Sequence, residues 1–321
     1  MNSLKTKRNS FDIFKKSHNI FIEGHRGVNR EYCQNTIDSF KQAIKYNLDS
    51  IELDIWLTKD KIPIVIHGGH FFGHLYGFIK NIGLFKRPKD FTLEEIMKLE
   101  LKETNQKIPT LSEVFDLCKN KIFINIEIKD LNVIETFNQV IKLIEEKKMI
   151  NQVAISSFNI KYYNLILNYN LLHNEKIEFG LIFGKSIFPF SKRKKYHYKN
   201  ICLNIYHKDI TKEIVDIAHK NGNAVMAWFT FKEKENESSY KRLFDCGIDV
   251  ICCNEPNKAK EYRDNKYYLS REKENEDISK KNFAFSSFKA IFYLIFLFAL
   301  VLPYILVGTR FNIFTKFYDF I

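Results

Sequence analysis

This sequence of 321 residues lacks a Cys-x-x-Cys pair, and it lacks an apolar segment near its start. It has six cysteines, most of them within apolar runs typical of buried strands or helices. Residues 1–17 are basic without an apolar stretch, which is not the pattern of a secretory signal. We therefore expect reduced thiols in the cytosol rather than disulfides.

Acidic residues are fewer than basic residues. The 50 Lys and Arg residues outnumber 38 Asp and Glu residues, which gives a net charge of +12. Such a charge can indicate nucleic acid or an anionic membrane as a partner. We attribute part of it to A/T-rich codons, because Lys, Asn, Ile, Phe and Tyr are abundant together. The 45% hydrophobic and 27% charged content is typical of a folded protein.

The composition divides the chain into five segments. They are a basic arm (1–18), a globular region (19–262), a charged linker (263–287), an apolar span (288–308) and a short tail (309–321). The globular region is long enough for one α/β barrel or for two smaller domains.

The apolar span is long enough to cross a bilayer as a helix, and a buried C-terminal helix is the alternative. Lys280, Lys281 and Lys289 precede or open the span, and Arg310 and Lys316 follow it. This distribution weakly favours a cytosolic globular region. We therefore predict a single-pass, tail-anchored membrane protein, with the endoplasmic reticulum as the expected membrane.

Segments with strand and helix patterns alternate through the globular region. Strands are expected at 20–23, 50–56, 64–67, 121–128, 153–156, 177–182, 201–203, 224–228 and 250–252. Helices are expected at 35–46, 92–99, 111–118, 133–146, 160–169, 211–220 and 240–246. Repeated strand–helix units with apolar strands predict an α/β fold with a covered parallel sheet. About eight such units favour a closed (β/α)8 TIM barrel.

Reactive groups in a (β/α)8 barrel gather at the carboxyl ends of its strands. Seven side chains are expected at such ends: His25, Arg26, Glu52, Asp54, His67, Glu127 and Lys129. Glu52 and Asp54 are two residues apart, so both point to the same face of a strand. Adjacent carboxylates repel each other unless a cation lies between them. With Glu127, they offer three hard oxygen ligands, which suit Ca²⁺ or Mg²⁺ better than zinc. A solvated strand pair is the alternative for Glu127 and Lys129.

Several motifs follow one another in a fixed order. They are His25-Arg26-Gly27, Asn35-Thr36, Glu52-Leu53-Asp54, His67, Glu127-Ile128-Lys129, Val225-Met226-Ala227-Trp228 and Gly247-Ile248-Asp249. This ordered set resembles the glycerophosphodiester phosphodiesterase family over residues 20–262, about three quarters of the chain. The resemblance implies a TIM barrel, hydrolysis of a phosphodiester, and a divalent metal on Glu52, Asp54 and Glu127.

The sequence departs from the family pattern at three places. Gln34 stands where the family has Glu, and Gly68 follows His67 where the family has Asp. The late Thr-Asp-x-Pro motif reads Cys253-Asn254-Glu255-Pro256. None of these changes removes a predicted ligand or proton-transfer group, although Gly68 bears on the orientation of His67. His70 and His74 are the neighbouring alternatives to His67.

The proposed reaction assigns roles to the remaining residues. Phosphodiester cleavage requires a base and an acid, and His25 and His67 are the expected pair. Arg26 and Lys129 are expected to hold the phosphate and offset charge in the transition state. Trp228 is expected to line the substrate pocket, with a role in the core as the alternative.

Two loops guide the prediction of the substrate. Residues 68–90 and 184–200, the second with the basic run 192–195, combine aromatic and basic side chains. This mixture suits a bilayer interface, although solvated loops would look similar. We predict lysophospholipids or related membrane lipids as substrates, and no nucleic acid or protein partner. The alternatives are a hydrolase of soluble glycerophosphodiesters such as glycerophosphocholine, and an inactive membrane-tethered lipid-binding protein.

Overall fold

The computed structural model describes residues 20–68, 73–102, 104–185 and 198–271, together with 273, 276 and 278. The basic arm, His70, the basic run 192–195 and the apolar span 288–308 lie outside these residues. Within the described part, every helix is too short or too polar to cross a bilayer. The chain divides into two compact units after Arg263.

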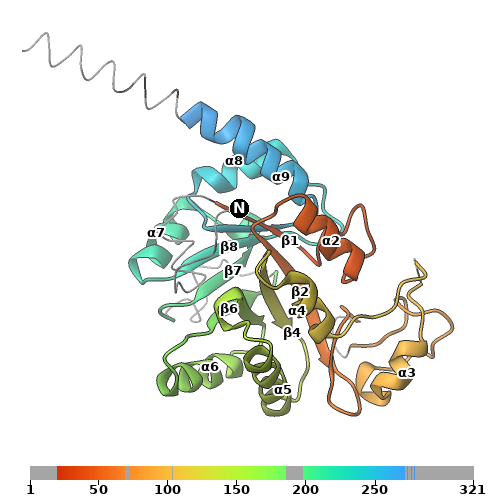
Figure 1. Ribbon diagram of the computed structural model, residues 1–321. Coiled ribbons are helices and arrows are strands. Elements are labelled where there is room, and N and C mark those ends of the chain that lie inside the picture. Colours follow the sequence, from red (N-terminus) through yellow and green to blue (C-terminus); the bar gives the residue numbers. More distant parts are fainter. Residues whose placement is uncertain are drawn as a thin grey trace, which may run out of the picture. The chain divides into compact units, whose positions relative to one another are not determined.

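Eight parallel strands of the described chain close into a barrel (Figure 1). They are β1 (Phe21–Gly24), β2 (Ser50–Leu57), β4 (Phe123–Ile128), β5 (Val153–Ser157), β6 (Glu178–Phe183), β7 (Cys202–Tyr206), β8 (Ala224–Trp228) and β9 (Val250–Cys253). Their order around the barrel is β1-β9-β8-β7-β6-β5-β4-β2, and the pairing of β1 with β2 closes it. The predicted (β/α)8 barrel is therefore confirmed.

Helices follow most of the strands. They are α2 (Ile37–Lys45), α3 (Leu93–Lys98), α4 (Leu111–Cys118), α5 (Val133–Glu146), α6 (Lys161–Leu172), α7 (Lys212–Lys220), α8 (Glu237–Asp245) and α9 (Pro256–Tyr262). Short 3-10 turns lie at Pro88–Asp90, Ile150–Gln152 and His207–Asp209, and a π-turn at Arg263–Tyr267. Side-chain caps start several helices: the Thr110 hydroxyl accepts from the Glu113 amide at 3.2 Å, and the Glu113 carboxylate accepts from the Thr110 amide at 2.8 Å.

One expected barrel strand is wrong. The segment predicted at 64–67 forms β3 (Pro63–Val65), which pairs antiparallel with the far end of β2 and lies outside the barrel. The chain reverses in a tight turn, where the Thr58 amide donates to the Ile62 carbonyl at 3.0 Å and Lys61 has φ +63°. A parallel strand needs a crossover of a dozen or more residues, which this turn does not provide.

The segment between β3 and α4, residues 66–109, is tied together at its two ends. The Val65 amide donates to the Pro109 carbonyl at 2.8 Å, and Ile64 forms a bridge with Thr110. This β3–α4 segment carries α3 (Figure 1). It also contributes to a hydrophobic cluster. The buried members of the cluster are Trp56, Ile64, Ile66, Leu75, Ile79, Ile96, Leu101 and Ile108.

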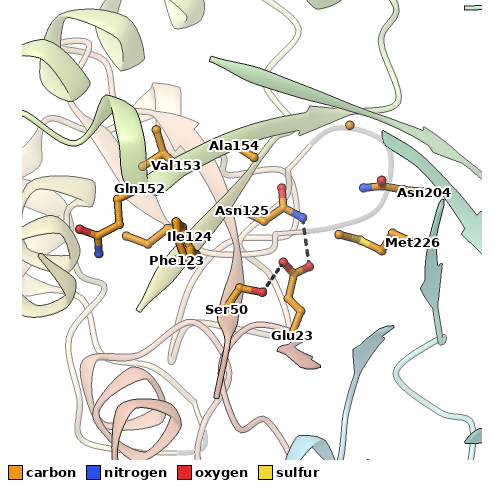
Figure 2. Close-up of a pocket in the computed structure, with 11 residues that line it drawn as sticks. Glu23, Ser50, Phe123, Ile124, Asn125, Gln152, Val153, Ala154, Asn204 and Met226 are labelled. Carbon is orange, nitrogen blue, oxygen red and sulfur yellow. Dashed lines mark hydrogen bonds between the residues drawn. The ribbon is translucent and has the colours of Figure 1, made fainter. Parts of the chain in front are cut away.

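The barrel interior contains a polar layer near the amino ends of its strands (Figure 2). The two carboxylate oxygens of Glu23 accept hydrogen bonds from Asn125 at 3.1 Å and from Ser50 at 3.0 Å. Asn204 and Met226 line the same cavity, whose volume of about 20 Å³ suffices for about one water molecule.

Candidate active site

Three carboxylates lie together inside the carboxyl half of the barrel. Glu52 and Asp54 project from β2, and Glu127 projects from β4, where it pairs in register with Asp54. Each offers an oxygen within 4.8 Å of the others, and all three residues are buried. The structure therefore brings the predicted metal ligands together. The sequence had suggested that Glu52 and Asp54 lie at the end of their strand. However, β2 continues to Leu57, so both residues lie within it.

Two cations offset part of this negative charge. Lys129 Nζ lies 2.6 Å from Glu127 Oε1 and 3.1 Å from Asp54 Oδ1, and Arg26 Nε lies 3.1 Å from Asp54 Oδ2. Burial raises the pKa of Asp54, but Lys129 and Arg26 outweigh this effect and hold the pKa well below its usual range. Glu127 and Lys129 are thus a buried ion pair, which rules out the solvated alternative.

Glu52 forms no ion pair with a lysine or arginine in the described part of the chain, unlike Asp54 and Glu127. Its Oε2 accepts from the Arg26 backbone amide at 2.9 Å, whereas its Oε1 is buried and has no hydrogen-bond partner among the described residues. Burial raises the pKa of Glu52, and the nearby Asp54 and Glu127 carboxylates raise it further. Three carboxylates facing two cations, with one orphaned oxygen, fit a site for an added cation.

His25 directly follows β1 and faces this cluster, with Nε2 4.0 Å from Glu52 Oε2. Its Nδ1 lies 2.9 Å from Asn254 Oδ1. The Asn254 side-chain amide donates to Glu235 Oε1 at 2.8 Å and to the Thr230 carbonyl at 3.1 Å, so its oxygen faces His25. His25 Nδ1 must then carry the proton, which leaves Nε2 free to accept one. Burial, reinforced by Arg26, lowers the pKa of His25 to about 3.

His67 reaches the same cluster from the β3 side. Because β3 runs back along β2, the Ile66 amide donates to the Asp54 carbonyl at 3.0 Å and delivers His67 to the level of the carboxylates. The His67 carbonyl accepts from Trp56 Nε1 at 3.0 Å. Burial lowers the pKa of His67 to about 2, and Asp54 opposes this shift.

Gly68 has a structural reason to follow His67. Its φ is +65°, and a Cβ at this position would meet the Gly73 backbone at 2.9 Å. A residue with a side chain would therefore be strained at this position. The departure from the family pattern thus suits the backbone conformation of Gly68.

Trp228 ends β8, on the side of the barrel away from β2 and β4. Its ring is half-buried and lies 5.3 Å from the Tyr206 ring, measured between centroids. Its Nε1 is buried without a partner among the described residues. The assignment of Trp228 to the substrate pocket stays a prediction.

Three residues that hydrogen-bond to predicted site residues were not themselves predicted from the sequence. Gln34 Oε1 accepts from Arg26 Nη1 at 2.5 Å, and Asn35 Nδ2 donates to Asp54 Oδ2 at 2.8 Å. Arg26 and Asn35 both adopt left-handed φ, near +56°, and the Asn35 amide donates to the Arg26 carbonyl at 3.1 Å. The third is Asn254. All three lie in or beside the motifs that carry the family resemblance, and this position was the signal in the sequence for a role in the site.

Comparisons with known proteins agree with this geometry. The family model described as "Glycerophosphoryl diester phosphodiesterase family" matches residues 25–258. A glycerophosphodiester phosphodiesterase of Caldanaerobacter subterraneus is 33% identical, over 73% of this chain and 94% of that protein. The human lysophospholipase D GDPD1 is 26% identical, over 75% of this chain and 85% of that protein. An Oleispira antarctica phosphodiesterase, solved with the product sn-glycerol-3-phosphate, has a TM-score of 0.61 at 22% identity, over 76% of this chain and 97% of that chain.

A barrel with converging carboxylates, histidines and cations at its mouth belongs to the class of phosphodiester hydrolases. The chain is a member of the glycerophosphoryl diester phosphodiesterase family. It is a phosphoric diester hydrolase that acts on glycerophosphodiesters.

Proposed function

We propose that this enzyme is a metal-dependent phosphodiesterase that cleaves lysophospholipids or related membrane lipids and releases a headgroup alcohol. The observation that carries the metal dependence is the buried cluster of Glu52, Asp54 and Glu127, whose oxygens lie within 4.8 Å of one another. These residues would hold Ca²⁺ or Mg²⁺, both of which prefer oxygen ligands. When bound there, the cation would polarise a phosphoryl oxygen.

His25 and His67 divide the proton transfer in this proposal. One imidazole takes the proton from the attacking oxygen, and the other gives a proton to the oxygen of the departing alcohol. His25 suits the base, because its Nδ1 proton is directed at Asn254 and its Nε2 is free to accept. The attacking oxygen belongs either to water or to a hydroxyl of the substrate; the second route passes through a cyclic phosphate.

Arg26 and Lys129 bind the substrate phosphate in this proposal. Each lies 3.1 Å from an Asp54 oxygen, so both are held at the mouth of the site by a carboxylate that stays ionised. From there they can donate charge-assisted hydrogen bonds to the substrate phosphate and stabilise charge that develops in the transition state.

Two observations support a lipid substrate. The human relative is named a lysophospholipase D. In addition, the β3–α4 segment exposes large apolar side chains: Tyr76 (57% exposed), Leu84 (57%) and Phe85 (78%). Lys80, Lys86 and Arg87 lie in the same stretch. Aromatic side chains mixed with basic ones suit the headgroup region of an anionic membrane.

The membrane location is part of the same proposal. We infer that the apolar span 288–308 anchors the protein by its tail, with the barrel in the cytosol. Protease treatment of sealed microsomes tests this topology. A tag placed after Ile321 should be shielded while the barrel is digested, and protection of the barrel would invert the assignment.

The substrate test uses the purified full chain in detergent. It is offered lysophosphatidylcholine and glycerophosphocholine, with added Ca²⁺ or Mg²⁺ and with chelator. Faster turnover of the lysolipid, lost in chelator and restored by metal, supports the proposal. Faster turnover of glycerophosphocholine would favour the soluble-substrate alternative. Full activity in chelator would refute the metal assignment.

A further inference from the structure

A second cluster of aromatic and charged side chains lies at the carboxyl ends of β7 and β8. Tyr206 ends β7, Trp228 ends β8, and Glu233 follows in the loop before α8. The two rings lie 5.3 Å apart between centroids and are tilted by 53°. The Tyr206 hydroxyl donates a short hydrogen bond to Glu233. The cluster thus joins two aromatic side chains to one carboxylate.

A cation of the chain already occupies this cluster. Lys185 Nζ lies 4.4 Å from the centroid of the Tyr206 ring and 3.7 Å from Glu233 Oε1. A cation within about 6 Å of an aromatic centroid is attracted by the electron-rich ring face. The Lys185 side chain is half exposed, so its ammonium can exchange this place for water at little cost.

Glu233 is fixed in the position that a cation needs. Its Oε2 accepts hydrogen bonds from the Thr230 amide at 3.0 Å and from the Thr230 hydroxyl at 2.8 Å. Lys208 Nζ lies 3.3 Å from Oε1, and His207 Nε2 lies 3.5 Å from Oε2. Burial raises the pKa of Glu233, but the hydrogen bonds from Tyr206 and Thr230 outweigh it, so the carboxylate is ionised. Burial lowers the pKa of His207 to about 4, so that imidazole is neutral near pH 7.

One asparagine connects this cluster to the active site. Asn254 donates to the Thr230 carbonyl at 3.1 Å, and its side-chain oxygen lies 2.9 Å from His25 Nδ1. The turn that holds Glu233 is therefore two hydrogen bonds from the proposed base. Trp228 Nε1 is buried without a partner among the described residues.

We propose that Tyr206, Trp228 and Glu233 form a subsite for the alkylammonium headgroup of the substrate, such as choline. The substrate ammonium displaces that of Lys185 and keeps both of its contacts, one with the aromatic face and one with the carboxylate. Its methyl groups also bury apolar surface against the rings, which the strongly hydrated Lys185 ammonium does not. This proposal rests on the proposed function, since it concerns the alcohol that the phosphodiesterase releases.

The test compares headgroups at constant acyl content. The full chain is assayed on glycerophosphocholine and glycerophosphoglycerol, and on the two corresponding lysolipids. We expect kcat/KM to favour choline in both pairs, by about tenfold. The acyl comparison tests the proposed function, whereas the headgroup comparison tests the subsite, so the two can fail separately. Equal rates on choline and glycerol substrates would overturn the subsite.

Three variants locate the effect. Glu233→Gln should raise KM for choline substrates about tenfold and change KM for glycerol substrates less than about twofold. Lys185→Met should lower KM for choline substrates, because the competing ammonium is gone. Lys208→Met is the matched control: it removes the other lysine near Glu233, for which no ring contact is seen in the described part of the chain. Equal effects of the two lysine variants would indicate general electrostatics and refute the aromatic subsite.

Tetramethylammonium gives a readout that does not depend on turnover. Its binding, measured by calorimetry on the full chain, should be tighter in Lys185→Met than in the original sequence and weaker in Glu233→Gln. Thermal unfolding of each variant shows whether it is folded. No difference in binding among three folded proteins would also overturn the proposal.

Discussion

Two buried glutamates on neighbouring strands of one barrel have different surroundings. Glu23 on β1 and Glu52 on β2 are 2% and 4% exposed, and burial raises the pKa of both. Both oxygens of Glu23 accept hydrogen bonds from neutral groups, Asn125 and Ser50 (Figure 2). Glu52 instead faces two further carboxylates, and one of its oxygens has no partner among the described residues.

The comparison separates two solutions to one problem. A buried carboxyl group can satisfy both of its oxygens with hydrogen bonds from neutral groups, as around Glu23. Alternatively, it can lie close to other carboxylates with one oxygen unpaired, as around Glu52, and this arrangement favours binding of a cation. Burial and a raised pKa therefore do not identify a functional carboxylate; the partners of its oxygens do.

The largest expected effect is on turnover after Glu52→Gln. Because this change removes one of three carboxylates that would bind the cation, kcat should fall on the order of 1,000-fold. Metal affinity, measured by calorimetry, should fall as well, while the midpoint of thermal unfolding stays near that of the original sequence. The matched control is Glu23→Gln, which should keep most of the activity. Similar losses in both variants would remove the distinction between the two sites.

The next effect concerns the two histidines. His25→Ala and His67→Ala should each lower kcat by about 100-fold or more, because each removes one proton-transfer group. The double variant should lose less than the product of the two single losses, since the residues act together. Assays of all three variants on one substrate measure this. Near-normal activity of His67→Ala together with loss in His70→Ala would transfer the role to His70.

A smaller effect is expected at Asn254, whose side-chain oxygen positions His25. Asn254→Ala should lower kcat by roughly 10-fold to 100-fold with little change in KM, because His25 loses the partner of its Nδ1 proton. Asn254→Asp keeps an acceptor for His25 but places a second carboxylate beside Glu235. It is therefore combined with Glu235→Gln, and this double variant should retain more activity than Asn254→Ala. If Asn254→Ala and the double variant lose activity equally, then the hydrogen bond to His25 is not what matters.

The smallest effect is a pH dependence of stability at Glu23. Burial raises its pKa above 4.5, so the folded state binds the proton more tightly than the unfolded state. This contribution is complete below pH 4.5 and is lost as pH rises through the raised pKa. Glu23→Gln mimics the neutral acid, so its free energy of unfolding should gain on that of the original sequence as pH rises. Urea unfolding at several pH values measures the difference, and a constant difference would contradict a raised pKa of Glu23.

Much of the barrel could be predicted because its signals are local. Short apolar strands, threonine caps and helical spacing each act within a few residues, so most elements were found close to their observed bounds. The helix α9 was missed, although Pro256 after Glu255 is a typical helix start. The segment 64–67 was misassigned because its composition suits a strand in either direction. Only the tight turn before it decides that direction.

The site was predictable in its charged residues and not in their support. Glu52 and Asp54 share a face by their spacing alone, and a parallel register places Glu127 beside Asp54. The contact between His25 and Asn254 joins residues 229 apart in sequence, and the one between Asn254 and Glu235 joins a carboxylate that no motif includes. The first of these pairs leaves no trace in local sequence patterns, since only closure of the barrel, with β1 beside β9, brings its members together.

The β3–α4 segment leaves and re-enters the barrel at a single point. Since the Val65 amide is bonded to the Pro109 carbonyl, the two ends of the segment stay fixed whatever lies between them. Its buried apolar residues, among those described, pack in one cluster with Trp56 and Ile64. Lengthening such a closed loop costs little additional entropy. The middle of this segment, with its exposed Phe85, can therefore change in sequence and length during evolution. Such changes alter the surface beside the barrel while Glu52, Asp54 and Glu127 stay in place.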